Sequence, residues 1–429
     1  MSLTGTRTFV GFGFGAIQSG LFLYESFRSG AFGRLVVAEV LPDVVNAIRQ
    51  ADRHFTVNIA HTDRIEQARI GPIEIENPAE AADRERLIEA IAQAHELATA
   101  IPSVKYYVSN GPGSLDRVLA AGLRRKAARQ GPPAVIYTAE NNNHAAEILQ
   151  EQVLAHIPAA ERDSVLAKVR FLNTVIGKMS GIKTDPAEIA ALQLARVVPG
   201  SDRAFLVETF NRILISKITF EAGAFERGIT VFEEKNNLLP FEEAKLYGHN
   251  ATHALAAYLG ARLGVQYIAD LVTAPGAMAF LRQAFIQESG AALVQKYNGM
   301  DPLFTPAGYQ AYADDLLARM TNPLLQDSVE RVGRDPQRKL GWNDRLIGTI
   351  RLALGQGIEP ARFAFGAAAA LGELDPALLE PNAPLGAVLE PLWEPAVPNP
   401  AEQAQVIQLI TAARLRLRQW LEAGSPNLA

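Results

Sequence analysis

The sequence predicts an α/β domain in the first half of the chain and a mainly α-helical domain in the second half. Three observations support this prediction. Up to about residue 200, short apolar runs alternate with amphipathic stretches, as in a parallel sheet covered by helices. Beyond Phe241, apolar residues recur at spacings of three and four, which is typical of helices. With 429 residues, the chain is also too long for one simple core.

The first domain is expected to start with a strand and to repeat a strand–helix unit. Its β-branched and aromatic runs favour strands, and each is followed by a stretch with helical periodicity. We expect strands at 8–13, 34–40, 106–109 and 134–138, with helices beginning near Ala16 and Val44. Since the elements alternate, the sheet should be parallel and doubly wound.

Pro199-Gly200-Ser201-Asp202 is a strong turn signal, and we place the domain boundary after Asp202. The predicted domains are therefore residues 1–202 and 203–429. A further strand is expected within 204–215. Later helices are expected at 253–263, 277–297 and 309–320, and a final amphipathic helix at 401–421. Between them, the proline-rich residues 375–400 should form an ordered wrap or a linker.

Composition narrows the classes of protein that the chain can belong to. A net charge of −5, with 48% hydrophobic and 20% charged residues, favours neither nucleic acid nor a membrane surface as partner. The absence of cysteine excludes disulfides, thiolate metal sites and a cysteine nucleophile. There is no apolar run of about 18 residues and no signal-peptide pattern at the start. We expect a cytoplasmic protein.

A glycine-rich turn follows the first expected strand. Gly13 and Gly15 permit a tight turn and let the backbone approach a pyrophosphate, and Ala16 and Ile17 open a helix whose N–H groups are free. In the pattern G-x-G-x-x-G, the last glycine is replaced by Gln18. These residues are candidates for binding a dinucleotide; the alternative is a purely structural turn.

Two further segments extend this candidate site. Glu39 ends the second expected strand, where a carboxylate accepts hydrogen bonds from ribose hydroxyls and repels a 2′-phosphate, which favours NAD over NADP. Asn110, Gly111 and Pro112 follow another expected strand and should face the same crevice. The alternative for these three residues is an ordinary loop.

Polar and titratable side chains concentrate in residues 241–254, beside an apolar helical run. On an ideal helix, Asn250 and His253 lie about 60° apart, and Lys245 lies about 80° from His253, so the three line one side. A surface lysine beside a core histidine fits the same spacing. His249 and His253 also have the spacing of a zinc pair. However, Asn250 replaces the glutamate of H-E-x-x-H, and we expect no metal.

A basic group surrounds a predicted helix start at Asp335-Pro336. Arg334, Arg338 and Lys339 lie at its N-terminus, where cations are disfavoured unless they share an anion. We interpret them as ligands of a substrate phosphate. The alternative is a solvated basic surface, paired with the acidic residues Asp327, Glu330 and Asp344.

The motif Lys245-x4-Asn250-x2-His253 resembles the signature of the polyol-specific long-chain dehydrogenases and reductases, the mannitol dehydrogenase family. Gly13-x-Gly15 with Glu39, Ala139-Glu140-Asn141 and the run 327–340 are similar to further parts of that family. The resemblance implies an α/β N-terminal Rossmann-type domain with a mainly α-helical C-terminal domain. It also implies a monomer or weak homo-oligomer.

The resemblance further implies NAD-dependent, metal-independent oxidation of a secondary alcohol. Lys245 is then the general base, Asn141 and Asn250 donate hydrogen bonds to the developing alkoxide, and His253 orients the substrate oxygen or the lysine. A lysine normally titrates near 10.4, and a useful base needs a pKa of about 7–8. Burial and the positive nicotinamide ring both lower the pKa of a lysine.

Three hypotheses follow from these observations. The first is interconversion of a polyol phosphate and a ketose phosphate with NAD, specifically mannitol 1-phosphate and fructose 6-phosphate. The second is the same chemistry on another polyol or a hexuronate. The third is a noncatalytic NAD-binding sensor. In each case the expected partner is a small molecule, with no nucleic acid and no membrane.

Overall fold

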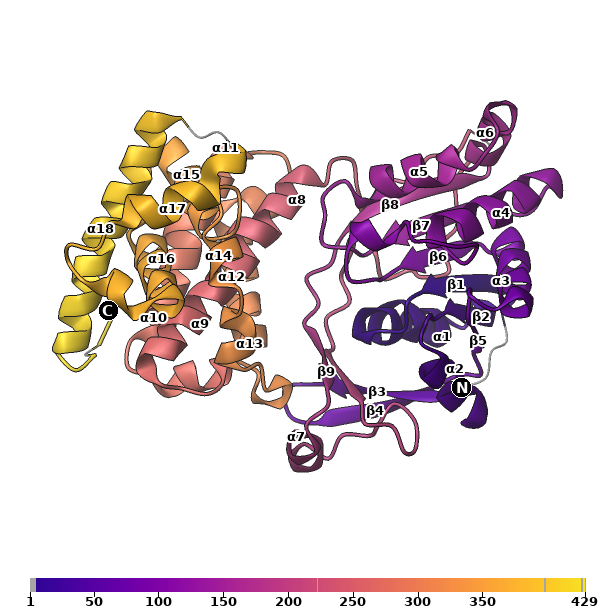
Figure 1. Cartoon of the computed structure of the whole chain (residues 1–429), viewed down its shortest axis with the longest axis horizontal. Helices are drawn as coiled ribbons and strands as arrows, with labels where there is room; N and C mark the ends of the chain where they lie inside the picture. The colour runs from indigo at the N-terminus through magenta and orange to yellow at the C-terminus, as the bar shows by residue number, and fades with distance from the viewer. Residues whose placement is uncertain (1–4, 222, 397–398, 426, 429) are drawn as a thin grey trace. The chain divides into compact units, whose positions relative to one another are not determined.

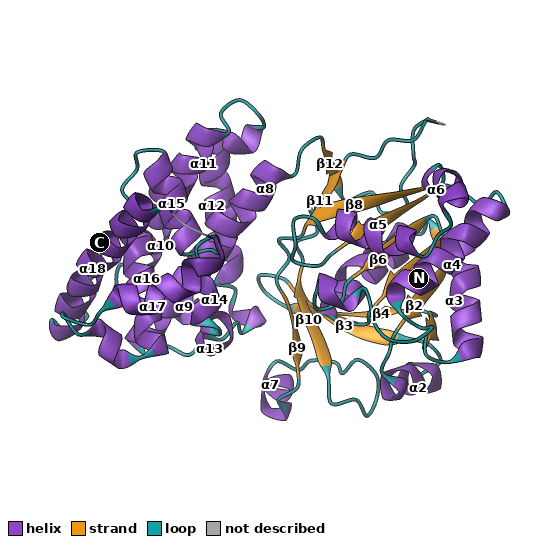
Figure 2. Cartoon of the chain, turned by 45° about the horizontal axis from the view of Figure 1, so that its top comes forward, coloured by secondary structure: helices purple, strands orange, loops and turns teal. Residues whose placement is uncertain are grey.

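The computed structural model describes residues 5–221, 223–396, 399–425 and 427–428 (Figure 1). The chain divides into two compact units, Met1–Leu239 and Pro240–Ala429. Within the described ranges, all strands belong to the first unit, whereas the second unit is built from helices and loops (Figure 2). The predicted fold class is confirmed.

The first unit contains an eight-stranded sheet in the order β12-β11-β8-β7-β6-β1-β2-β5. Its strands are β1 (Arg7–Phe12), β2 (Phe32–Ala38), β5 (Glu74–Glu76), β6 (Glu96–Thr99), β7 (Ala134–Thr138), β8 (Val169–Val175), β11 (Leu214–Ser216) and β12 (Glu233–Lys235). From β8 to β5 all pairs are parallel. The strand order reverses between β1 and β6, and such a switch point opens a crevice at the carboxyl ends of the strands.

A second sheet has the order β4-β3-β10-β9. It consists of β3 (Phe55–Ala60), β4 (Ile65–Ile70), β9 (Ser180–Lys183) and β10 (Ala204–Glu208). β10 pairs with β3, and β11 pairs with β8, so strands beyond residue 202 complete the sheets of the first unit. For this reason the structure places the division after Leu239 and not after Asp202.

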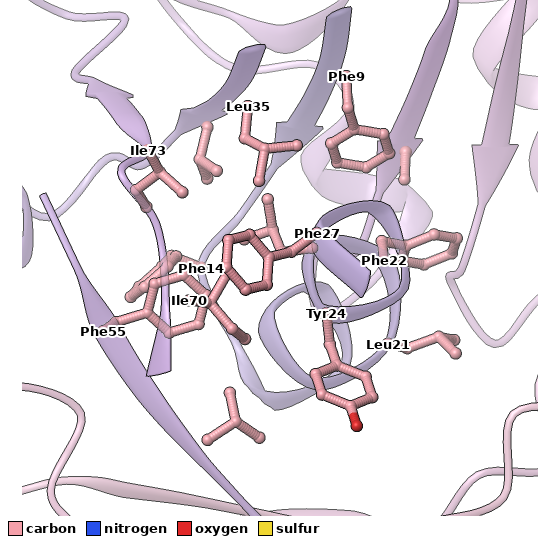
Figure 3. Packing of buried hydrophobic residues seen from close by; sticks show 14 of the residues in the cluster. Phe9, Phe14, Leu21, Phe22, Tyr24, Phe27, Leu35, Phe55, Ile70 and Ile73 are labelled. Atoms are coloured by element: carbon pink, nitrogen blue, oxygen red, sulfur yellow. The ribbon is translucent and has the colours of Figure 1, made fainter. Parts of the chain in front are cut away.

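Helices pack on the first unit's sheets around two hydrophobic cores. They are α1 (Tyr24–Ser29), α2 (Pro42–Gln50), α3 (Ala81–Gln93), α4 (Leu115–Ala128), α5 (Ala145–Ala155), α6 (Ala159–Leu166) and α7 (Pro186–Ala191). In one core, Phe14 of the glycine turn lies edge-on to Phe55, with ring centroids 5.0 Å apart (Figure 3). Phe14 also contacts Phe205. The turn is thereby anchored to the second sheet by an aromatic side chain.

The prediction of a strand at 106–109 is wrong. These residues form the end of a short 3₁₀ turn, Val104–Tyr106, followed by bends, and the neighbouring strand is β6. Pro102 and the capping side chain of Ser103 interrupt an extended conformation, and of the four residues only Tyr107 is buried. The apolar residues Tyr106 and Val108 are exposed, so their run does not mark a buried strand.

The second unit packs its helices around the almost wholly buried α9 and α16. The helices are α8 (Leu239–Glu243), α9 (Ala251–Leu263), α10 (Ala277–Gln283), α11 (Ala291–Lys296), α12 (Pro306–Met320), α13 (Val329–Gly333), α14 (Pro336–Lys339), α15 (Ile347–Gly355), α16 (Ala361–Leu374), α17 (Leu385–Trp393) and α18 (Pro400–Glu422). Two π-helical segments interrupt them, η3 (Ala244–Asn250) and η5 (Ala284–Gly290). None of the helices in the described ranges combines the length and hydropathy required to cross a bilayer.

The proline-rich segment is ordered where the structure describes it, that is, up to residue 396 and from residue 399. It contains a 3₁₀ turn at Pro376–Leu379 and then α17, whose Trp393 is fully buried. The buried guanidinium of Arg414 in α18 donates hydrogen bonds to the carbonyls of Leu378, Pro381 and Ala383. These bonds hold the segment against the last helix, as an ordered wrap does; residues 397–398 lie outside the described residues.

Candidate active site

The glycine turn after β1 has the backbone geometry that the motif predicts. Gly13 has a φ of 86°, and a Cβ there would lie 2.8 Å from the carbonyl oxygen of Ala100, so no other residue fits without strain. At Gly15 a Cβ would meet nothing within 4 Å. The backbone at Gly15 therefore faces open space, and Ala16 and Ile17 form the first helical residues.

Gln18, which replaces the last glycine of the pattern, is fully buried and begins a π-helical segment, Gln18–Leu23. Its side chain packs on Gly11 of β1, where a Cβ would clash with the amide group. Close packing of helix and strand usually depends on a glycine in the helix. Here the glycine lies in the strand, and the wider helical turn accommodates the larger side chain.

Glu39 holds the end of β2 to the glycine turn. Its Oε2 accepts a hydrogen bond from the Phe14 N–H at 3.0 Å, and its Oε1 accepts one from the Leu41 N–H at 2.9 Å. A carboxylate offers about four lone-pair positions, so each oxygen keeps one for another donor. The side chain predicted to accept ribose hydroxyls is thus buried, oriented by backbone and still able to accept.

A cavity of about 370 Å³ opens beside this carboxylate. Its lining combines the ends of β1 and β2 with the segment after β6: Phe12, Gly13, Ala38, Glu39, Val40, Pro78, Ile101, Pro102, Tyr106, Ser109, Gly113, Leu115 and Val118. Glu39 is the charged side chain in an otherwise mainly apolar lining. The apolar wall suits a flat ring, and the carboxylate suits hydroxyl groups attached beside that ring.

The predicted residues Asn110, Gly111 and Pro112 are exposed on the loop between two lining residues, Ser109 and Gly113. Sequence reasoning missed Val40 and Tyr106, which are 67% and 52% exposed. Exposed apolar side chains have no local signature in a sequence, because their exposure is set by the fold.

Asn141 is exposed in the turn after β7. Its neighbour Glu140 is buried and accepts hydrogen bonds from Thr99 Oγ1 at 2.8 Å, the Ile101 N–H at 3.0 Å and the Tyr107 hydroxyl. Burial raises the pKa of Glu140, although these bonds oppose that effect. Glu140 therefore ties the Asn141 turn to the segment after β6 that lines the cavity.

In the second unit, Lys245 and Asn250 lie in the π-helical segment η3, and His253 lies two residues into α9. In an α-helix, residues five apart lie about 140° from one another around the axis. A π-helix bonds residue i to residue i+5 and so stacks such residues on one face. The π-turn therefore brings Lys245 and Asn250 onto a common face more closely than the ideal α-helix predicts.

Lys245 is half-buried, and its pKa is lowered to about 8 by burial first and then by the charge of Arg345, against an opposing effect of Glu242. The Arg345 side chain is mostly buried, and its Nε lies 2.8 Å from Asp344 Oδ1. Sequence reasoning missed Arg345, because its effect on Lys245 depends on the packing of α15 against η3.

The two histidines of this helix differ. His249 is fully buried, and burial lowers its pKa well below the ordinary value, so it is neutral at physiological pH. His253 is partly exposed, and its Nε2 lies 3.0 Å from Oδ2 of the buried Asp327. The ring centroids of the histidines are 6.2 Å apart. Within the described ranges, no three or more His, Cys, Asp or Glu side chains are arranged to hold a metal ion.

The predicted helix start at Asp335 is present. The Asp335 side chain accepts a hydrogen bond from the Arg338 N–H at 3.3 Å, and Pro336 opens α14, which has only four residues. Arg334 and Arg338 are exposed. Lys339 is buried, and its Nζ donates to the Arg334 carbonyl. Two of the three predicted phosphate ligands therefore reach solvent, while Lys339 supports the turn that carries them.

The same arginine that acts on Lys245 also acts on Lys339. Burial lowers the pKa of Lys339 to about 8, with further contributions from Arg345 and Arg338. Arg345 thus contributes to the lowered pKa of both Lys245 and Lys339 within the second unit. Of the acidic residues in the alternative interpretation, Asp327 is buried against His253 and Asp344 pairs with Arg345. Arg338 itself pairs with Asp335, with Nε 3.1 Å from Oδ2.

Comparison with known families divides the chain in the same way as the structure. Residues 7–228 match the mannitol dehydrogenase Rossmann domain, and residues 237–374 match the mannitol dehydrogenase C-terminal domain. The chain is 31% identical over 343 residues to mannitol-1-phosphate 5-dehydrogenase of Bacillus licheniformis, an alignment that covers 79% of this chain and 80% of that protein.

Two solved structures share the fold over nearly the whole chain. A substrate-free D-sorbitol dehydrogenase superposes with a TM-score of 0.75 at 14% identity, covering 97% of this chain and 94% of its own. The mannitol 2-dehydrogenase of Pseudomonas fluorescens, solved with NAD and D-mannitol, gives 0.68 at 18% identity, covering 98% and 93%. At these identities the likeness concerns the fold alone.

Proposed function

Since this chain belongs to the mannitol dehydrogenase family, we propose that it is an NAD-dependent oxidoreductase that interconverts a polyol phosphate and a ketose phosphate. One observation gives this proposal its strongest support. Lys245 of the family motif lies in η3 with a pKa of about 8, so a substantial fraction of it is neutral near physiological pH and able to accept a proton.

The first unit fits NAD. The open space at Gly15 and the N–H groups of Ala16 and Ile17 suit a pyrophosphate. The apolar cavity suits an adenine, and the remaining lone pairs of Glu39 suit the ribose hydroxyls. A 2′-phosphate beside this buried carboxylate is repelled, which favours NAD over NADP. When bound, NAD supplies the acceptor for the hydride that the alcohol carbon loses.

The chain's own residues then accept the hydroxyl proton and stabilise the charge that develops on the oxygen. Neutral Lys245 takes the hydroxyl proton on Nζ as the hydride leaves. Asn250 and Asn141 are proposed to donate hydrogen bonds to the oxygen as negative charge develops on it. His253 is proposed to orient the substrate. In the reverse direction, protonated Lys245 returns the proton to the carbonyl oxygen.

The phosphate part of the proposal rests on Arg334 and Arg338. Both are exposed at the same turn, supported by buried Lys339, and guanidinium groups bind phosphate through paired N–H donors. The similarity to a protein named mannitol-1-phosphate 5-dehydrogenase agrees with this assignment. We therefore propose mannitol 1-phosphate and fructose 6-phosphate as the substrate pair.

A substrate panel tests the proposal. The purified protein is incubated with NAD and polyols, polyol phosphates or hexonates, and with NADH and the matching ketoses, ketose phosphates or hexuronates, and the absorbance of the reduced cofactor is followed. We expect turnover of mannitol 1-phosphate and fructose 6-phosphate. Turnover of mannitol but not of its phosphate would contradict the phosphate assignment. Binding of NAD without turnover of any compound would support a noncatalytic sensor.

A pair of arginine variants locates the phosphate. Arg338→Ala should raise the KM for the phosphorylated substrate by about 10-fold or more, since a hydrogen bond to a charged group contributes about 1.5–3 kcal/mol. Its kcat and its activity on unphosphorylated polyols should change little. Arg416→Ala, which removes an exposed arginine of α18 in the same unit, serves as the control. Equal effects of the two variants would remove Arg338 from the site.

A further inference from the structure

We infer that Asp327 is a positioning residue that holds the proton of His253 on Nε2 and thereby leaves Nδ1 as a hydrogen-bond acceptor for the substrate. The inference rests on the proposed function, because it gives His253 a specific role in that reaction. The role is also narrower than substrate orientation in general, since a ring nitrogen with a free lone pair accepts a hydrogen bond and cannot donate one to the alkoxide.

The pair is enclosed. Asp327 Oδ2 lies 3.0 Å from His253 Nε2, with the side chains 4% and 14% exposed. Both atoms are buried, and within the described part of the chain neither makes a well-aligned hydrogen bond, so their 3.0 Å approach is the contact that can satisfy them. A buried donor or acceptor that is left unpaired costs about 1–3 kcal/mol, so the N–H of the ring belongs on the nitrogen that faces the carboxylate.

The carboxylate is itself fixed by its surroundings. The Arg331 Nε donates to Asp327 Oδ1 at 2.9 Å. The backbone carbonyl of Asp327 accepts from the Ile268 N–H at 2.9 Å, and the next residue, Ser328, caps α13. Oδ1 is therefore committed to the arginine, and Oδ2 is left to face the histidine.

The charge state agrees with this arrangement. Burial by itself raises the pKa of Asp327, but its contacts with His253 and Arg331 outweigh burial and bring that pKa below its ordinary value. The side chain is then a carboxylate at neutral pH, which accepts hydrogen bonds only. The neighbouring His249 is neutral and buried, and so adds no competing charge to the ring of His253.

An Asp327→Asn variant separates this role from simple packing. The asparagine has nearly the same shape, but its single carbonyl oxygen must face the donor Arg331. Its amide N–H₂ then faces His253 Nε2, which forces the ring proton onto Nδ1. An analogous loss of a carboxylate partner places a catalytic histidine in the wrong tautomer.

The tautomer is read by long-range ¹H–¹⁵N NMR on the full chain labelled at histidine, without substrate. We expect the wild-type His253 to carry its proton on Nε2 and Asp327→Asn to move it to Nδ1. Asp327→Glu, which keeps a carboxylate, should retain the wild-type tautomer at least in part. A wild-type proton on Nδ1, or an unchanged tautomer in a folded Asp327→Asn variant, would overturn the inference.

Activity completes the test. Asp327→Asn should lower kcat by about 10-fold to 100-fold, as expected for one lost hydrogen bond in a charged site, with NAD affinity unchanged. The control Asp270→Asn weakens a carboxylate bond to the Tyr267 N–H in the same unit and should lower stability without changing kcat or the tautomer. A changed tautomer with full kcat in an active enzyme would also overturn the inference.

The two proposals fail separately. If the protein turns over no compound in the panel, the proposed function fails, while the NMR measurement still tests the tautomer. If Asp327→Asn does not fold, the wild-type spectrum alone decides where the proton lies. If turnover is found and the wild-type proton is on Nδ1, only the role of Asp327 is lost.

Discussion

The two units of this chain place opposite charges at their candidate binding regions. In the first unit, Glu39 and Glu140 are buried at the carboxyl ends of parallel strands, and each accepts hydrogen bonds from backbone N–H groups. In the second unit, Lys245 is half-buried and Lys339 is buried, and Arg345 contributes to the lowered pKa of both.

This difference indicates that the two units have different roles. A carboxylate that accepts hydrogen bonds from backbone amides fixes the shape of a loop, and Glu39 keeps one lone pair on each oxygen for a ligand. A lysine whose pKa is lowered by burial and by a neighbouring cation is partly neutral near physiological pH and can then accept a proton. We therefore expect changes in the first unit to alter binding of the cofactor, and changes in the second unit to alter proton transfer and substrate recognition.

The largest expected effect lies in the second unit. Lys245→Ala should lower kcat by about 10²-fold to 10⁴-fold, the usual contribution of a general base. The Kd for NAD, measured by fluorescence titration, should stay within about twofold, because the glycine turn and Glu39 lie in the other unit. Lys296→Ala, which removes a lysine paired with Glu243 at the surface of the same unit, is the control. A parallel loss of NAD affinity in Lys245→Ala would break the proposed division of roles.

The counterpart in the first unit is Glu39→Ala. It removes the acceptor for the Phe14 and Leu41 N–H groups and for the ribose, so the Kd for NAD should rise by about 10-fold to 100-fold. Discrimination against NADP should weaken, while kcat at saturating NAD stays nearly unchanged. The control is Glu74→Ala, which removes a β5 carboxylate that pairs with Arg34 of β2. It reports the effect of a general loss of negative charge. An unchanged preference for NAD would show that another residue discriminates the cofactors.

The smallest effect, a shift along the pH axis, sharpens the comparison most. Polyol oxidation requires neutral Lys245, so log kcat should rise with pH and level off above about 8, and ketose reduction should fall through the same range. In Arg345→Gln one of the causes that lower the pKa of Lys245 is removed, so the whole profile should move to higher pH. Rate measurements from about pH 6 to 10, on either side of that pKa, with Arg416→Ala as the control, test this shift. A profile that stays in place would assign the lowered pKa to burial alone.

Much of the fold was predictable, because most strands and helices carry their own local pattern. β1, β2 and β7 are mainly apolar runs, and α9, α12 and α18 have helical periodicity. The run at 106–109 has the same apolar character without a pairing strand, and nothing local distinguishes the two cases. The division after Leu239 depends on β10 and β11 pairing with strands far back in the chain, which turn signals near Pro199 do not reveal.

Prediction of the site had similar limits. The identities of Lys245, Asn250, His253 and Asn141 came from a motif and a family resemblance, and Glu39 came from its place after the second strand. Their surroundings depend on tertiary packing. Asp327 approaches His253 from the loop before α13, and Arg345 acts on Lys245 through space. The π-turn that carries Lys245 also has no sequence rule comparable to the caps that mark ordinary helices.

The π-turn in η3 lets this helix carry one extra residue without loss of the face that its motif side chains share. A π-turn is one residue longer than an α-turn, so removing any one residue between Lys245 and Asn250 allows the helix to close into an uninterrupted α-helix. The flanking residues then keep nearly the same orientation around the axis, whereas insertion of one residue turns Lys245 by about 100° relative to His253. One-residue insertions across 246–249 should therefore be excluded from functional relatives more strictly than one-residue deletions.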